Sequence, residues 1–258
     1  MFTAAFDASG RELGLPALCV AGFISSANDW IEFSQKWNAR LQQDGVTFFR
    51  ASELAHSVGQ FEGWKGQEKR RRRLQSDLME LVVANAYRKF GCVLDNSKMG
   101  QIPDAVKEHY YINAYSLAGR TCVSDVARWK KVEKITAPTE FVFEDGDVGK
   151  EELRKRMVED AHPEPIFRPK KDETNPDSSI RRQAFVPLQA ADWLAYEYFL
   201  ALKHVVYEKK QNYELRWGIE QFERIPGPVG TFLDSDFEAL NLGLRVSAET
   251  MFLTRLIP

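Results

Sequence analysis

Short runs of apolar residues alternate along the chain with longer stretches in which apolar residues recur every three or four positions. The short runs predict β-strands over residues 2–6, 15–25, 46–50, 88–94, 139–143 and 165–168. The longer stretches keep their apolar residues on one face and predict helices over residues 30–43, 67–86, 104–129, 150–159 and 187–204. Strands that alternate with long helices are typical of an α/β domain. The first two strands predict a hairpin, so we expect a mixed sheet.

Four stretches do not follow this alternation. Residues 56–66 are polar and rich in glycine, and residues 170–179 are polar and contain proline, so both are expected to be surface loops. Residues 207–228 are charged and aromatic without a clear period, whereas residues 232–257 have a mostly helical pattern. We therefore predict one domain over residues 1–206, with a C-terminal extension over residues 207–258 that packs on it.

The helix predicted over residues 187–204 carries a carboxylate on its apolar face. Asp192 shares this face with Leu188 and Ala195 at spacings of four and three residues. Carboxylates are rarely buried unless they are paired or bound to a metal. Asp192 therefore needs a partner, for which the alternatives are a shared cation and a hydrogen bond from Gln189 or from the backbone.

Two further acidic groups lie where predicted strands end. Asp7 follows the first strand, and Glu144, Asp145 and Asp147 follow the strand over residues 139–143. Functional groups gather at the carboxyl ends of strands in open α/β sheets, so these carboxylates would meet that of the late helix if the helix crosses this edge. Such oxygen ligands suit Mg²⁺ or Mn²⁺, the ions of phosphodiester hydrolysis. The alternatives are an Asx turn at the first group and a turn or helix entry at the second.

Four segments of the chain resemble, in the same order, those of the bacterial and phage family called domain of unknown function 3800. They are F-D-A-S-G (Phe6–Gly10), F-F-R-A-S-E-L (Phe48–Leu54), F-V-F-E-D-G-D (Phe141–Asp147) and V-P-L-Q-A-A-D-W-L-A-Y (Val186–Tyr196). The resemblance covers about residues 2–204, and the Q-x-x-D helix is its most specific segment. It implies a ribonuclease H-like fold: a central mixed sheet flanked by helices, with helical insertions and a C-terminal extension.

In that fold the first strand, a middle strand and a late helix each give an acidic metal ligand. The resemblance implies that Asp7, Glu144 and Asp192 are the catalytic residues of a nuclease that depends on Mg²⁺ or Mn²⁺. Asp145 is the alternative to Glu144 as a metal ligand. Gln189 lies one helical turn before Asp192, so we expect it to orient that carboxylate or a water on the metal.

The chain departs from the family pattern at two positions. Ala8 stands where the family usually has a second acid, and Arg50 stands where it often has a histidine. The loss of an acid motivates the alternative of a catalytically inactive module that binds nucleic acid or protein. Ser9, beside Ala8, would either hydrogen-bond a ligand or serve only the turn.

The overall charge gives no pull toward nucleic acid, because 35 Lys and Arg residues stand against 37 Asp and Glu residues. A nucleic-acid partner therefore depends on local basic groups. Residues 69–73 (K-R-R-R-R) are the densest run, although they surround a helix rather than form one stripe. The residues expected to contact phosphate lie near the acidic segments: Arg50, Lys170, Lys171, Arg181 and Arg182.

Cysteine usage and missing motifs exclude several other classes. Cys19, Cys92 and Cys122 are odd in number and widely spaced, so neither a disulfide framework nor a zinc site is expected. The sequence has no P-loop, dinucleotide-binding or hydrolase nucleophile motif. Its longest apolar run is too short to cross a bilayer and no signal peptide is visible, so we expect a cytoplasmic protein that does not contact membranes.

Overall fold

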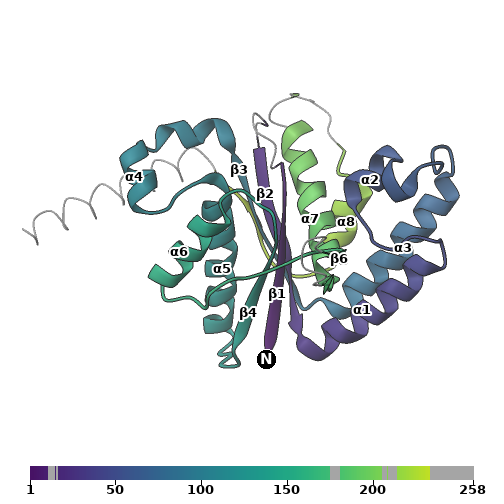
Figure 1. The fold of residues 1–258 in the computed structure, drawn as a ribbon, viewed down its shortest axis with the longest axis horizontal. Coiled ribbons are helices and arrows are strands. Elements are labelled where there is room, and N and C mark those ends of the chain that lie inside the picture. Colours follow the sequence, from purple (N-terminus) through teal and green to yellow (C-terminus); the bar gives the residue numbers. More distant parts are fainter. Residues whose placement is uncertain (11–14, 16, 175–180, 205–207, 209–213, 233–258) are drawn as a thin grey trace, which may run out of the picture.

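A six-stranded mixed sheet forms the centre of the computed structural model, which describes all residues except 11–14, 16, 175–180, 205–207, 209–213 and 233–258 (Figure 1). In spatial order its strands are β5 (Ile166–Arg168), β4 (Thr139–Glu144), β1 (Phe2–Ser9), β2 (Ala17–Ser26), β3 (Arg88–Asp95) and β8 (Val229–Thr231). β1, β2 and β3 form an antiparallel meander, while β4 runs parallel to β1, β5 to β4 and β8 to β3. The prediction of an α/β fold with a mixed sheet is therefore confirmed.

Helices cover both faces of this sheet (Figure 1). One face carries α1 (Ala27–Gln42), α3 (Glu68–Asn85), α7 (Pro187–Leu202) and α8 (Trp217–Phe222). The other face carries α5 (Ala114–Val132) and α6 (Lys150–Glu159), with α4 (Asp104–His109) at its end. Successive strand residues point to opposite faces, so Ala5 packs against α7 whereas Phe6 and Ala8 pack with α5 and α6. By the same alternation, Asp7 points toward α7.

Smaller elements lie in the connections: α2 (Ala51–His56), η1 (Gly59–Phe61), η2 (Asn96–Gln101), β6 (Glu173–Thr174) and β7 (Arg181–Arg182). The helices predicted over residues 30–43, 67–86, 150–159 and 187–204 are confirmed to within a few residues as α1, α3, α6 and α7. The surface loop predicted over residues 56–66 contains η1 and buries Phe61 and Trp64. Of the loop predicted over residues 170–179, β6 takes two residues, and residues 175–179 lie outside the described part of the chain.

The single helix predicted over residues 104–129 is wrong, because the chain breaks into α4 and α5. Tyr111 has a left-handed φ of 52°, which ends the first helix. Asn113 then begins α5 with a capping box, in which its side chain accepts the Ser116 N–H and the Ser116 hydroxyl accepts the Asn113 N–H. Because the apolar period continues across the break, the sequence pattern does not reveal it.

The strand predicted over residues 46–50 is also wrong. Its backbone N–H groups bond to side chains: Thr47 N–H donates to Gln60 Oε1 at 2.7 Å, and Phe49 N–H donates to Gln189 Oε1 at 2.8 Å. These bonds take the place of the ladder that a strand needs. The segment is thereby fixed to α7 beside the sheet instead of extending the sheet.

α7 is buried on nearly all sides, whereas the sequence predicts one apolar face. Every residue from Pro187 to Glu197 is buried. Leu188 packs on Ala5 and Val142 of the sheet, while Trp193 packs on the opposite side against α8. Polar groups on a helix so enclosed need partners inside the protein. These groups are Gln189, Asp192 and Glu197.

The described residues after 206 return to the same sheet. α8 lies against α3 and α7, and β8 pairs with β3. The turn before β8 requires a glycine, because Gly227 has a φ of 125° and a Cβ there would lie 1.9 Å from the Lys89 carbonyl oxygen. The helical pattern predicted over residues 232–257 lies outside the described residues from 233 onward. Within the described residues, no helix is long and apolar enough to cross a membrane.

Candidate metal centre

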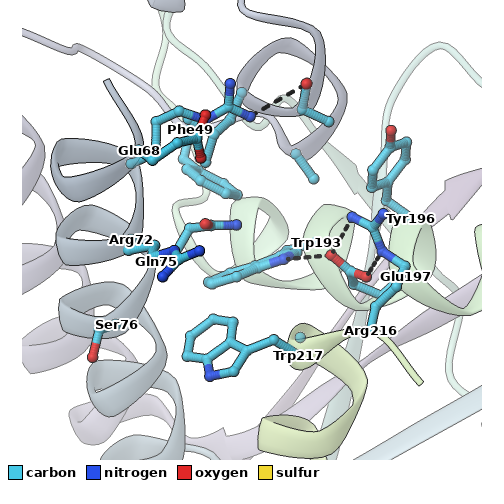
Figure 2. A pocket seen from close by; sticks show the side chains of 15 residues that line it. Phe49, Glu68, Arg72, Gln75, Ser76, Trp193, Tyr196, Glu197, Arg216 and Trp217 are labelled. Atoms are coloured by element: carbon cyan, nitrogen blue, oxygen red, sulfur yellow. Dashed lines mark hydrogen bonds and ion pairs between the residues drawn. The ribbon is translucent and has the colours of Figure 1, made fainter. Parts of the chain in front are cut away.

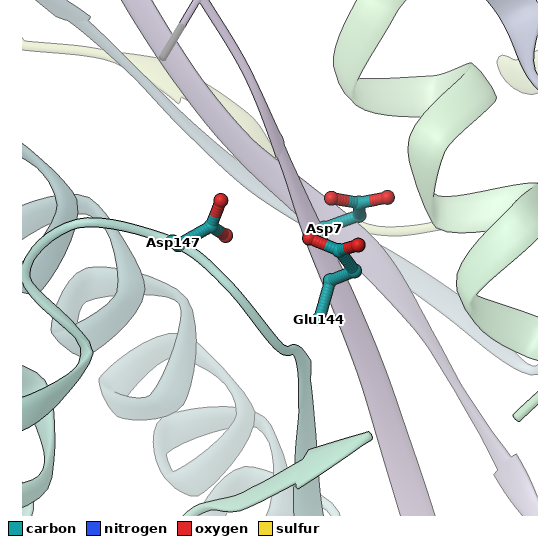
Figure 3. A group of neighbouring side chains, drawn as sticks. All are labelled: Asp7, Glu144 and Asp147. Carbon is teal, nitrogen blue, oxygen red and sulfur yellow. The ribbon is translucent and has the colours of Figure 1, made fainter. Parts of the chain in front are cut away.

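Three carboxylates meet at the end of the sheet where β1 and β4 finish. β1 and β4 are parallel neighbours with Phe6 opposite Phe143, so Asp7 and Glu144 come next along the two strands. Asp147 comes from the loop that follows β4 (Figure 3). One carboxylate oxygen from each of Asp7, Glu144 and Asp147 lies within 4.8 Å of the other two. The parallel pairing of β1 and β4 therefore brings the acids of both strand ends together.

This donor set suits a divalent cation such as Mg²⁺ or Mn²⁺. Both ions prefer carboxylate oxygens, and the three groups are close enough to share one ion. Asp7 is only 1% exposed and Asp147 only 5% exposed, whereas Glu144 is half-buried. Buried negative charges this close together repel one another, so a cation at this place would relieve that repulsion.

Asp145, the alternative ligand at the end of β4, lies outside this cluster. Its Oδ1 accepts a hydrogen bond from Lys150 Nζ at 2.8 Å, and its Oδ2 pairs with Arg182 Nη1 at 2.7 Å. The hydrogen bond from Lys150 and the pairing with Arg182 outweigh partial burial and hold the pKa of Asp145 below its ordinary value. Gly146, with a φ of 99°, then turns the chain, and Asp147 reaches the cluster instead.

The residues around Asp7 on β1 divide between the two faces of the sheet. Ala8 is buried among α5 and α6, so the position where the resembling family has a second acid points away from the carboxylate cluster. Ser9 lies two residues after Asp7, on the same face as Asp7, and is half-buried at the end of the strand. Ala8 therefore removes no ligand from the side of the sheet where the three carboxylates meet.

A lysine ammonium joins Asp7 to Asp192. Lys170 Nζ lies 2.7 Å from Asp7 Oδ2 and 2.7 Å from Asp192 Oδ1, and all three side chains are buried. The structure thus brings Asp192 beside Asp7, but the cation that these two carboxylates share is a lysine. The sequence places Lys170 in a polar loop. The only signal for its role was the unmet charge of Asp192 on an apolar face.

Lys170 is held in place by hydrogen bonds from the chain around the start of α7. Gln189 Nε2 donates to the Lys170 carbonyl oxygen at 2.8 Å. Phe185 N–H donates to the carbonyl oxygen of the preceding residue, Pro169, also at 2.8 Å. Because these bonds fix two successive peptide units, the ammonium has a defined position between the carboxylates.

Asp192 and Gln189 also hold the segment that leads into α2. Asp192 Oδ2 accepts the Ala51 N–H at 2.9 Å. Gln189 Oε1 accepts both the Trp37 Nε1–H at 2.9 Å and the Phe49 N–H at 2.8 Å. The sequence predicts that Gln189 orients either the Asp192 carboxylate or a water on the metal. Its hydrogen bonds go to groups around Asp192, so Gln189 supports the surroundings of that carboxylate.

We expect Gln189→Leu to lower the free energy of unfolding by about 3 kcal/mol, because it leaves the buried donors of Trp37 and Phe49 without an acceptor. Urea unfolding would measure the loss. Gln35→Leu, at an exposed position on α1, is the matched control and should change stability by less than about 0.5 kcal/mol. Equal effects of the two substitutions would contradict the supporting role of Gln189.

The basic residues expected to contact phosphate have different surroundings. Arg50 is exposed, with Nη1 3.9 Å from Glu53 Oε1. Arg182 is partly exposed and is engaged by Asp145. The side chain of Arg181 lies outside the described part of the structure. Arg50 thus presents its charge to solvent more openly than Arg182 does.

Comparisons with protein-family models, with curated proteins and with solved structures found no match for this chain.

Proposed function

We propose that the chain is a nuclease that hydrolyses phosphodiester bonds with Mg²⁺ or Mn²⁺. The observation that carries this proposal is the approach of Asp7, Glu144 and Asp147 to within 4.8 Å of one another at the end of the sheet. Asp192 adds a fourth carboxylate, held beside Asp7 by Lys170. Carboxylates gathered in this way are the usual means by which proteins hold the cations of phosphodiester hydrolysis.

A ribonuclease H-like fold, and membership of the family called domain of unknown function 3800, are part of the proposal. The antiparallel meander of β1 to β3, with β4 and β5 parallel beside β1, agrees with the central mixed sheet that the resemblance implies. The acidic residues come from the first strand, from the end of a middle strand and from a late helix, as that resemblance also implies. Likeness of fold is a weak argument for function, so the site carries the proposal.

In this proposal Asp7, Glu144 and Asp147 hold the cation. A bound divalent cation neutralises charge that develops on the phosphate and lowers the pKa of an attacking water. Lys170 neutralises one of the carboxylate charges and so eases the approach of an anionic phosphate.

A cleavage assay on labelled single-stranded and duplex DNA and RNA, with Mn²⁺ or with EDTA, tests the proposal. Cleavage that requires the metal supports it. The absence of cleavage of all four substrates, from a chain whose melting temperature Mn²⁺ does not change, would contradict it.

Asp192→Asn is expected to lower cleavage at least about 100-fold, because the fourth carboxylate charge is lost from the site. We expect a loss of about 2 kcal/mol in stability as well. The amide nitrogen would have to face either the Ala51 N–H or the Lys170 ammonium. Single-turnover cleavage at a temperature where the variant is folded measures the first effect. Asp125→Asn on α5, whose carboxylate pairs with Arg128, is the control and should cleave like the wild type.

One observation favours a second candidate, a module that binds nucleic acid without cleaving it. The Lys170 ammonium already fills the space between Asp7 and Asp192, where a second divalent ion would otherwise bind. Under this candidate, oligonucleotides bind but remain intact with Mn²⁺, and Mn²⁺ leaves the melting temperature unchanged. Under the nuclease proposal, Mn²⁺ raises the melting temperature and Asp7→Asn removes that rise.

A further inference from the structure

A pocket lies between α3, α7, α8 and the start of α2 (Figure 2). Its volume is about 750 Å³, which is within the range of sites for small organic ligands. Aromatic and basic side chains dominate its lining. They are Phe49, Trp193, Tyr196 and Trp217, together with Arg71, Arg72 and Arg216.

Trp217 offers an aromatic face to this pocket. It is 42% exposed, which is unusual for so large an apolar side chain, whereas the neighbouring Trp193 is 1% exposed. The two rings lie 6.3 Å apart between centroids with an interplanar angle of 34°. Trp193 is held in place by a hydrogen bond from its Nε1 to Glu197 Oε1 at 3.2 Å. The pocket therefore has a fixed aromatic floor with one ring open to a ligand.

Some basic side chains of the pocket donate hydrogen bonds to other residues of the protein, whereas another is exposed to solvent. Arg216 donates to Glu197, and Arg71 donates to the Ser57 hydroxyl at 2.8 Å, so both guanidinium groups already have acceptors. Arg72 is exposed and extends with Gln75 from α3 into the pocket (Figure 2). Among the described residues, no ion pair engages Arg72. Arg72 thus supplies positive charge for a ligand, and the Gln75 amide supplies both a donor and an acceptor.

The pocket borders Asp192 at α7 and at the segment before α2. Ala51 lines the pocket and donates its N–H to Asp192. Tyr196, one turn after Asp192, also lines the pocket. Burial raises the pKa of Tyr196, and the nearby Glu197 and Asp192 charges raise it further while Arg216 opposes them. The pocket and the candidate metal centre thus share the turn of α7 from Asp192 to Tyr196.

We infer that this pocket binds one unstacked base of a single-stranded nucleic acid, with the base stacked on Trp217 and contacted by Arg72 and Gln75. The inference rests on the proposed function, because it places a phosphate of the same strand at the carboxylates. Every base has a face that stacks on tryptophan, and the guanidinium of arginine adds to such binding. A base enters such a pocket at the lowest cost from a strand that is already unpaired, so the inferred substrate class is single-stranded.

Binding in EDTA tests the inference without any cleavage. The probe is a 5′-labelled single-stranded 12-mer of deoxyadenosine, followed by fluorescence anisotropy. Trp217→Ala and Arg72→Ala should each raise Kd about tenfold, and Trp217→Phe should restore most of the affinity. Arg73→Ala is the matched control, because Arg73 is the next residue of the same basic run but does not line the pocket. It should raise Kd no more than about twofold.

Three results would overturn the inference. They are equal losses in the Arg72 and Arg73 variants, an unchanged Kd in Trp217→Ala, and no binding of the 12-mer. Hydrolysis of bis(p-nitrophenyl) phosphate, which has no nucleobase, separates this inference from the proposed function. Its Mn²⁺-dependent hydrolysis without base-dependent binding keeps the nuclease proposal and rejects the pocket inference. Base-dependent binding without any hydrolysis keeps the pocket inference and rejects the nuclease proposal.

Discussion

Lys170→Met should lower the free energy of unfolding by about 3–5 kcal/mol, because it removes the ammonium shared by two buried carboxylates. Asp7 is 1% exposed and Asp192 8% exposed, so water cannot replace the lost cation without opening the structure. Methionine keeps most of the side-chain volume, and the loss therefore reports charge rather than packing. Urea unfolding in EDTA measures it.

A divalent cation should recover part of this loss. Without the ammonium, Asp7 and Asp192 lose the positive charge that they share, and Mn²⁺ binding to the folded state stabilises that state by mass action. We expect the rise in melting temperature with Mn²⁺ to be larger in Lys170→Met than in the wild type. Lys171→Met is the matched control, since Lys171 is the adjacent exposed lysine and should cost under about 1 kcal/mol. If both variants were equally stable, Lys170 would not be the partner of the two carboxylates.

Glu144→Gln should lower metal-dependent cleavage about 1,000-fold, because a divalent cation contributes several kcal/mol to the transition state of phosphodiester hydrolysis. The substitution keeps the size of the side chain and removes one of the three charges of the cluster. Mn²⁺ titration by calorimetry should show weaker binding in the same variant. These two readouts separate loss of the metal from loss of the substrate.

Asp145→Asn is the matched control, because it removes the adjacent carboxylate of the same loop. Asp145 is engaged by Lys150 and Arg182 and lies outside the cluster. Cleavage should stay within about threefold of the wild type, and Mn²⁺ affinity should be unchanged. A larger defect in Asp145→Asn than in Glu144→Gln would assign the metal to the other acid and contradict the arrangement proposed here.

The pattern of apolar residues predicted most of the helices and strands. It failed where backbone N–H groups bond to side chains instead of to the backbone of a neighbouring strand. The apolar runs of β1 and β4 identify strands, and a parallel pairing then brings Asp7 and Glu144 together. Residues 46–50 have the composition of a strand, but the N–H groups of Thr47 and Phe49 bond to the side chains of Gln60 and Gln189. Gln189 lies 140 residues after Phe49 in the sequence. No period in the sequence records such a bond.

The candidate site was predicted only in part, because some of its contacts also join residues that are distant in sequence. The position of Asp192 on an apolar helix face predicted that its carboxylate has a partner. The partner, Lys170, is polar and lies in a segment of polar composition, so only the fold brings it inward. The sequence named Asp145 as the alternative to Glu144 and missed Asp147, because Asp147 reaches the cluster only through the turn at Gly146.

The enclosed position of α7 has a consequence for the order in which the site is built. Asp7 is synthesised long before Asp192, whose helix α7 contacts β1 and β2. Contacts between such distant parts of a chain form late, because a long loop has to close first. The surroundings of Asp7 are therefore complete only when α7 docks, so an unfinished chain would carry Asp7 and Glu144 without Asp192 and without the Gln189 bond that holds Lys170.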